Sequence, residues 1–183
     1  MSNLSILVFW DTKISETIIY LRSDFFNHFF FFVTGFGEWK VITALFIIIS
    51  FGFYLSLKRD LIFPFFISVF GSGVTALIIK YIVDRSRPGS GIALYHEKLS
   101  SFPSAHAALA CAFFGFLIYC LWRFDISVRL KIVLSSIFSL MIILVSFSRL
   151  YLGVHYLSDV LAGFLTGLLW LIITMYVSYR RAS

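Results

Sequence analysis

Charged residues are scarce in this sequence. Asp, Glu, Lys and Arg make up 13% of the 183 residues, whereas 60% are hydrophobic and the mean hydropathy is +0.96. This composition excludes an ordinary soluble domain. Five stretches are long enough, or nearly so, to cross a bilayer core that needs about 20 apolar residues: 41–57, 61–79, 107–122, 132–147 and 156–179. The sequence therefore predicts an all-α, polytopic transmembrane helix bundle with five spans, in a single domain over residues 1–183.

The sequence also lacks the features of a disulfide-stabilised protein and of several other enzyme classes. It has two cysteines, Cys111 and Cys120. Nine residues of helix turn about 900°, so these two thiols face opposite ways and cannot form a disulfide within the chain. The sequence has no Gly-x-Ser-x-Gly elbow, which disfavours a serine hydrolase, and no His-x3-His or Glu-x-x-His pair, which disfavours a metal site. It also lacks internal repeats and low-complexity linkers.

Residues 1–38 are predicted to lie at the membrane interface, beside a catalytic bundle formed by residues 39–183. The apolar run at 4–10 is too short to span a bilayer. The residues that follow place three aliphatic side chains on one helical face: Ile14, Ile18 and Leu21. A span here would bury charges in lipid: Glu16, Arg22 or Asp24. Amphipathic interfacial helices avoid this cost; the alternative is a first span, which would give six.

Ionisable residues gather in three short polar segments at predicted membrane boundaries, where such groups are costly and indicate a functional site. In the first, Lys80 and Arg87 are seven residues apart, which leaves them within about 20° of one helical face. Pro88 then ends the helix. Two stacked cations suit a phosphate, although either alone would also fit a snorkelling fringe at a span end. Asp84 and Arg85 are expected to be local ion-pair partners.

The second segment, Pro103-Ser104-Ala105-His106, opens the next predicted span. Proline and serine favour helix starts, so the first backbone N–H groups are expected to point into the site and attract an anion. Ser104 adds a hydroxyl donor, and His106 is placed to exchange protons with a leaving oxygen. In isolation the same four residues would also fit an N-capped helix with an interfacial histidine.

The third segment contains Ser148, Arg149, His155 and Asp159. His155 and Asp159 are four residues apart at the start of the last span, so they share a helical face and lie close enough to hydrogen-bond. A carboxylate bonded to one imidazole nitrogen leaves the other nitrogen free as a nucleophile. A purely structural His–Asp pair is the alternative. His28 and His96 match no motif.

Together the three segments resemble the signature of the type 2 phosphatidic acid phosphatase family, within the acid phosphatase and vanadium haloperoxidase superfamily. That signature reads Lys-x6-Arg-Pro, Pro-Ser-Gly-His and Ser-Arg-x5-His-x3-Asp, and every position matches here except Ala105, which replaces a glycine. Alanine keeps the backbone N–H but loses access to positive φ. The resemblance covers roughly residues 35–180. It implies that His155 is the nucleophile, that His106 is the general acid and that residue 105 offers its amide to phosphate.

The expected function is metal-independent hydrolysis of a phosphate or diphosphate monoester on a membrane lipid such as phosphatidylglycerophosphate, phosphatidate or undecaprenyl diphosphate. The predicted catalytic residues are His155, His106 and Asp159. The predicted phosphate-binding residues are Lys80, Arg87, Ser104, Ala105 and Arg149. No metal or cofactor is expected, because the clustered cations would repel a divalent ion. The alternatives are a lipid A phosphatase, a lipid-to-lipid phosphotransferase, and a non-catalytic headgroup binder or transporter.

The distribution of basic residues predicts the orientation in the membrane. The cations of the three motifs are assigned to the site, and the opposite ends of the spans carry basic loops at 58–59 and 123–131 and a basic tail at 180–181. Such loops lie in the cytoplasm, so the motifs should face the extracytoplasmic side of the plasma (inner) membrane. These anchors and an anion site account for the net charge of +6, so no nucleic-acid partner is expected. Nothing in the sequence indicates an oligomeric state.

Cysteine accessibility tests this topology. In a background with Cys111 and Cys120 replaced, probe cysteines at Ser2 and Gly91 should both react with an impermeant thiol reagent applied to the outer face. Reaction at Gly91 alone would mean that residues 1–38 span the membrane. Reaction at Ser183 without reaction at Ser2 or Gly91 would invert the predicted orientation.

Overall fold

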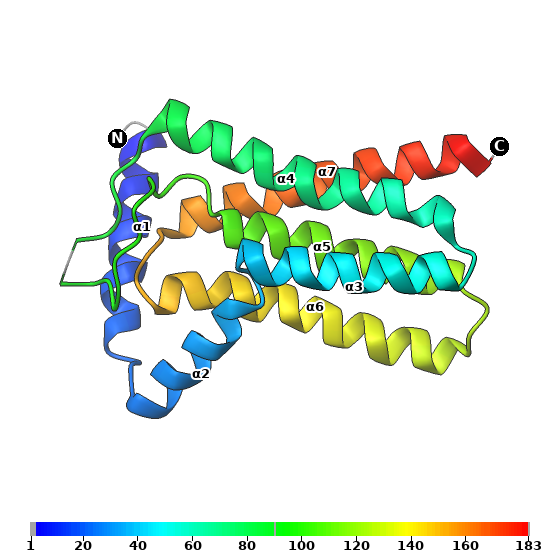
Figure 1. The fold of residues 1–183 in the computed structure, drawn as a ribbon. Coiled ribbons are helices and arrows are strands. Elements are labelled where there is room, and N and C mark those ends of the chain that lie inside the picture. Colours follow the sequence, from blue (N-terminus) through cyan, green and yellow to red (C-terminus); the bar gives the residue numbers. More distant parts are fainter. Residues whose placement is uncertain (1–2, 90, 183) are drawn as a thin grey trace.

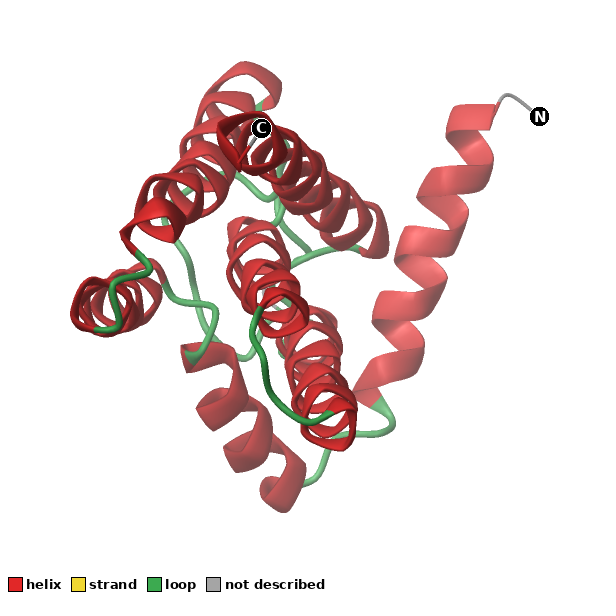
Figure 2. Cartoon of the chain, turned by 90° about the vertical axis from the view of Figure 1, so that its right-hand side faces the viewer, coloured by secondary structure: helices red, strands yellow, loops and turns green. Residues whose placement is uncertain are grey.

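The computed structural model describes residues 3–89 and 91–182, and within these ranges it is helical with no strand (Figures 1 and 2). Met1, Ser2, Ser90 and Ser183 lie outside the described residues, and with them two of the probe positions above. The elements are α1 (Asn3–Ile19), α2 (Asp24–Gly35), α3 (Trp39–Leu55), the 3₁₀ helix η1 (Arg59–Leu61), α4 (Ile62–Val83), α5 (Ala105–Arg123), α6 (Val128–Tyr151) and α7 (Leu157–Ala182).

The helix α5 forms the centre of the bundle and packs against α4, α6 and α7. All ten of its residues from Ala107 to Phe116 are buried. The rings of Phe65 on α4 and Phe116 on α5 stack with centroids 4.8 Å apart, and the surrounding phenylalanines continue this core. The outer helices instead expose aliphatic side chains such as Ile137 and Leu140, as lipid-facing helices do.

The predicted membrane bundle is confirmed, and its five apolar stretches correspond to α3, α4, α5, α6 and α7. Four helical segments among the described residues are individually long and apolar enough to cross a membrane: Arg59–Val83, Ala105–Arg123, Val128–Tyr151 and Leu157–Ser178. The helix α3 has 17 residues and qualifies only together with α2, from which it is bent by 51°. The structure therefore has four candidate spans, or five if α2 and α3 form one bent span.

The N-terminal helix α1 lies across one end of the bundle (Figures 1 and 2). Ile14 and Ile18 pack into a cluster with the ends of α6 and α7, whereas Leu21 lies beyond the helix and is exposed. The prediction that Leu21 shares a helical face with them is therefore wrong, because α1 ends at Ile19. Asp11, which was not assigned to that face, is buried there. The division between an interfacial segment and a bundle at residue 38 stays a prediction.

Small residues allow α7 to approach the start of α5 closely. A Cβ added at Gly163 would meet the carbonyl oxygen of Ser104, and one added at Gly167 would meet the carbonyl oxygen of Ala108. Small residues at helix contacts in membranes permit such backbone approach. The two helix starts that carry the second and third motifs are also joined by a backbone hydrogen bond of 2.9 Å from Ser104 N to Asp159 O.

This contact gives a stability prediction. Gly167→Val would place carbon atoms against the backbone of α5, so it should lower the free energy of unfolding by about 1–3 kcal/mol. A thiol-reactive fluorogenic dye can follow thermal unfolding in detergent, because Cys111 and Cys120 are both buried. Gly52→Ala is the matched control, since its added Cβ meets no atom within 4 Å. Equal melting temperatures for the two variants would contradict the packing argument.

Candidate active site

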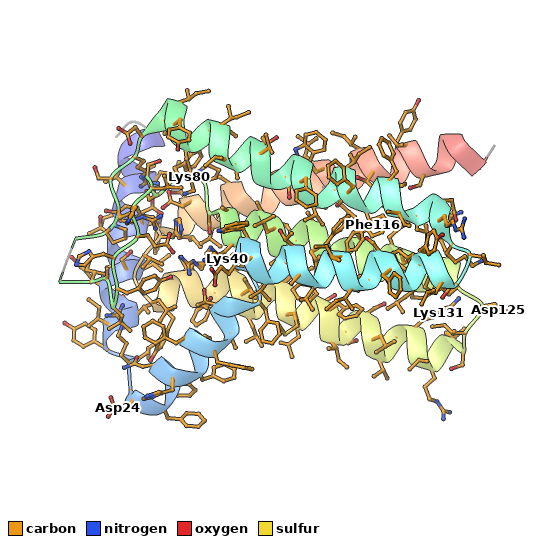
Figure 3. The ribbon with its side chains drawn as sticks, viewed as in Figure 1. Asp24, Lys40, Lys80, Phe116, Asp125 and Lys131 are labelled. Carbon is orange, nitrogen blue, oxygen red and sulfur yellow. The ribbon has the colours of Figure 1, made fainter. Side chains whose placement is uncertain are left out.

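The three polar motifs meet at the end of the bundle that α1 crosses. Lys80 lies near the end of α4 at this side, whereas Asp125 and Lys131 mark the opposite end (Figure 3). The loop between α4 and α5 covers the same end, beside α1 (Figure 1). Arg149 lies in the last turn of α6, and Asp159 lies in the first turn of α7. Residues distant in the sequence are thus brought together, as the motif analysis predicts.

His155 lies in the short connection between α6 and α7 and is only 1% exposed. Gly153 makes the turn before it with a φ of 71°, a region in which glycine meets no steric penalty. The His155 Nδ1 atom lies 3.5 Å from Asp159 Oδ2, so the two side chains are adjacent as predicted, at a distance longer than a usual hydrogen bond. The same Asp159 oxygen accepts a hydrogen bond of 2.9 Å from Tyr156 N.

The other imidazole nitrogen of His155 faces a cation. Arg87 Nη1 lies 3.3 Å from His155 Nε2 and donates a bond of 2.6 Å to the carbonyl of Val154. Burial lowers the pKa of His155 well below its usual range, and the positive charges of Arg149 and Arg87 lower it further. The imidazole is therefore neutral at neutral pH, and a neutral ring carries the lone pair that a nucleophile needs.

Arg149 is fully buried at the end of α6. Its Nη1 donates to Thr34 Oγ1 at 2.6 Å and to the Tyr95 hydroxyl at 2.5 Å, and its Nη2 forms an ion pair with Glu97 Oε1. The second Glu97 oxygen accepts from Arg87 Nη2 at 2.7 Å. The Glu97 carboxylate thus joins the arginines of the first and third motifs.

Glu97 was not among the site residues predicted from the sequence. Burial alone would raise the pKa of its carboxyl, but the opposing charges of Arg149 and Arg87 hold that pKa at about 2. An available signal was its place in the chain, because this acid lies in the loop between the basic first motif and the second motif. Tyr95, whose hydroxyl donates to Glu97 at 3.0 Å, and Thr34 carried no such signal.

A cavity of about 510 Å³ opens beside these groups. Its walls include Lys80, Arg87, Glu97, Ala105 and His106, so parts of the first and second motifs face one space. The Lys80 ammonium is buried and donates to the carbonyl of Ser100 at 2.6 Å. It therefore also fixes the loop that carries Glu97.

The second motif begins α5 as predicted. The Ser104 hydroxyl accepts the N–H of Ala107 at 3.5 Å and caps the helix. Ser104 is completely buried, whereas Ala105 and His106 are partly exposed and line the cavity. The structure thus gives the Ser104 side chain a capping contact. Within the described residues, no three His, Cys, Asp or Glu side chains gather as a metal ion would require.

Comparison with known proteins agrees with the motifs. A family model described as the PAP2 superfamily matches residues 61–183. The chain belongs to the PAP2 superfamily. Phosphatidylglycerophosphatase B of Bacillus subtilis (strain 168) is 31% identical over 163 residues, which are 87% of this chain and 78% of that protein. The family resemblance inferred from the three PAP2 motifs is thereby confirmed.

Two solved structures share the fold. A transmembrane PAP2 type phosphatidylglycerolphosphate phosphatase from Bacillus subtilis superimposes with a TM-score of 0.86 at 27% identity, over 93% of this chain and 85% of that one. LpxE of Aquifex aeolicus superimposes with a TM-score of 0.74 at 22% identity, over 91% and 94% of the two chains, and is similar in fold. This PAP2 protein is therefore an integral membrane hydrolase of the lipid phosphatase type.

The ion pairs of Glu97 predict a pH-dependent stability. Its folded pKa of about 2 lies below the ordinary 4.5, so the stabilisation is present above pH 4.5 and is lost as pH falls from 4.5 toward 2. Glu97→Gln should lower the melting temperature at neutral pH, because it leaves the buried Arg149 without its carboxylate. The difference from wild type should shrink below pH 4.5. Glu16→Gln, on the exposed face of α1, is the control. A melting-temperature difference between Glu97→Gln and wild type that does not change with pH would contradict the role of the ion pairs.

Proposed function

We propose that this PAP2 protein hydrolyses a phosphate or diphosphate monoester of a membrane lipid, without a metal ion, through a phosphohistidine at His155. One observation carries the proposal: the buried His155 directs Nε2 toward Arg87, within a cluster where Arg87 and Arg149 together bind a carboxylate. A nucleophile beside a two-arginine anion site is the arrangement that phosphoryl transfer needs.

In the first step His155 Nε2 attacks phosphorus, and the bond from phosphorus to the lipid oxygen breaks. His106, which enters this step as the imidazolium, gives its proton to that oxygen and becomes neutral, and Asp159 supports the positive charge that develops on the His155 ring. In the second step His106 takes a proton from water, whose oxygen attacks the phosphohistidine and releases phosphate. The 3.5 Å separation of His155 Nδ1 from Asp159 supports this division between the two ring nitrogens.

The phosphoryl oxygens are proposed to bind Lys80, Arg87, Arg149 and the backbone amide of Ala105. Ser104 is the fifth proposed donor, since its oxygen accepts in the helix cap and its hydroxyl proton is not used there. Substrate phosphate has to replace Glu97 between the two arginines, so the carboxylate serves as an internal stand-in for one edge of the phosphoryl group. These contacts are worth most in the transition state, where negative charge spreads over the oxygens.

An apolar cavity supports a lipid as the substrate. A space of about 380 Å³ lies between α3 and α4 and is lined by residues such as Trp39, Ile42 and Val69. Lys80 and Ala105 line both this space and the polar cavity. A molecule with an acyl or prenyl chain in the first and a phosphate in the second would fill both. Phosphatidylglycerophosphate, phosphatidate and undecaprenyl diphosphate all meet this description.

The proposed location is the inner membrane, with the active site on the extracytoplasmic side. The support is the position of Lys131, at the end of the bundle opposite Lys80 (Figure 3), together with the basic loop that contains Arg59. Short loops rich in lysine and arginine lie in the cytoplasm. The substrate would then come from the outer leaflet.

Phosphate release from these three lipids by the purified protein, in detergent with EDTA, tests the proposal. Release should persist in EDTA and be inhibited by vanadate, which resembles five-coordinate phosphorus. His155→Ala should lower kcat by more than about a thousandfold, whereas Asp159→Asn should retain more activity because it damages orientation only. His28→Ala, at an exposed histidine of α2, is the control. Full activity of His155→Ala, or an absolute requirement for a divalent metal, would refute the mechanism.

A further inference from the structure

Arg85 joins two buried carboxylates that come from opposite ends of the chain. Its Nη1 donates to Asp159 Oδ1 at 2.7 Å, and its Nη2 donates to Asp11 Oδ2 at 2.8 Å. Asp159 is completely buried, and Asp11, on the N-terminal helix α1, is 3% exposed. The prediction that Arg85 is a local ion-pair partner is wrong, because its two partners are distant in the sequence.

Asp11 also binds the start of α7. Its Oδ1 accepts the backbone N–H of Ser158 at 2.9 Å, and its Oδ2 accepts the Ser158 hydroxyl at 2.5 Å. The N–H groups of a first helical turn have no partners within the helix, so α1 supplies a capping carboxylate to α7. Asp159, one residue further on, accepts the N–H of Tyr156. Two carboxylates from different helices thus hold the first turn of α7.

These contacts restrict the Asp159 side chain. Arg85 holds one carboxylate oxygen, and Tyr156 N holds the other, which is the oxygen that faces His155. Arg85 is itself held by Asp11, and its guanidinium lies over the Tyr156 ring at 4.4 Å. A planar guanidinium that binds two carboxylates has little freedom to turn.

We propose that Asp11 and Arg85 are positioning residues for the reaction: Asp11 orients Arg85, Arg85 orients Asp159, and Asp159 orients His155. The N-terminal helix α1 is then part of the catalytic apparatus and not only an attachment to the membrane interface. This inference rests on the proposed role of His155. It predicts that a change on α1 slows the chemical step without weakening phosphate binding, because neither residue contacts the Glu97-occupied anion site.

The first test is the kinetic effect of Asp11→Asn on the lipid that wild type hydrolyses fastest. Asparagine can still accept the Ser158 N–H, but it loses the ion pair with Arg85. We expect kcat to fall roughly 10- to 100-fold, as small misplacements of reacting groups do. KM and the rise in melting temperature produced by vanadate should stay close to wild type. If Asp11→Asn loses both kcat and its stabilisation by vanadate, the whole site is disrupted, and the positioning role is overturned.

A double-mutant cycle tests whether Asp11 acts through Arg85. If it does, Asp11→Asn should add little to the loss in kcat caused by Arg85→Gln, whereas independent residues would give additive losses. Ser15→Ala is the matched control on α1, since Ser15 is buried one turn away and its hydroxyl bonds to the Asp11 carbonyl of its own helix. Additive kcat losses for Asp11→Asn and Arg85→Gln would overturn the positioning role of α1. A loss of kcat in Ser15→Ala as large as that in Asp11→Asn would overturn it as well.

Arg85→Lys keeps the inference testable if Asp11→Asn does not fold. Lysine retains the charge but lacks the planar fork that binds both carboxylates, so kcat should fall while vanadate still stabilises the variant. A wild-type kcat in Arg85→Lys would overturn the inference. Failure of the proposed function appears differently: His155→Ala would then stay active, whatever the Asp11 and Arg85 variants do.

Discussion

Positive charge buried at a membrane boundary has to be neutralised, and the polar end of this protein is organised around that requirement. Arg149 is completely buried there, Arg85 and Arg87 are partly buried, and an unpaired buried charge is strongly destabilising. Three carboxylates from three parts of the chain meet them: Glu97 pairs with Arg87 and Arg149, while Asp11 and Asp159 pair with Arg85. These ion pairs connect α1, the α4–α5 loop and α7, whose apolar side chains also meet in one cluster at this end.

The apolar part of the bundle fixes the positions at which α5 and α7 begin. The helix α5 is buried along most of its length, so its first turn cannot shift without disturbing the core. Glycines of α7 let that helix lie against α5, next to the backbone of Ser104. The proposed acid, His106, therefore lies in the first turn of α5, and the proposed nucleophile, His155, lies just before the start of the adjoining α7. A reaction that needs two histidines at a fixed separation benefits from this rigidity.

Apolar runs and motif spacing predicted the bundle and the family, because both signals are local in the sequence. The adjacency of His155 and Asp159 was predicted from helical spacing, although His155 lies just before α7 begins, and the helix start at Ser104 was predicted from its capping chemistry. Asp11 and Glu97 could not be found this way, since their partners lie far along the chain and only the packed structure selects them. The bend between α2 and α3 was missed for the same reason: helix direction depends on tertiary contacts.

The hydrogen bond from Ser104 N to Asp159 O joins the start of α5 to the first turn of α7. One wall of the site is formed where these two helices begin, beside the proposed reacting groups His106 and His155. The other wall consists of α3, the end of α4 and the loop between α4 and α5. Side chains of these segments line the apolar space, and the loop includes Glu97. Substitutions in this second wall can change the shape offered to a lipid headgroup while the reacting groups stay in place. Divergence among relatives with different substrates would then concentrate in α3 and residues 89–102.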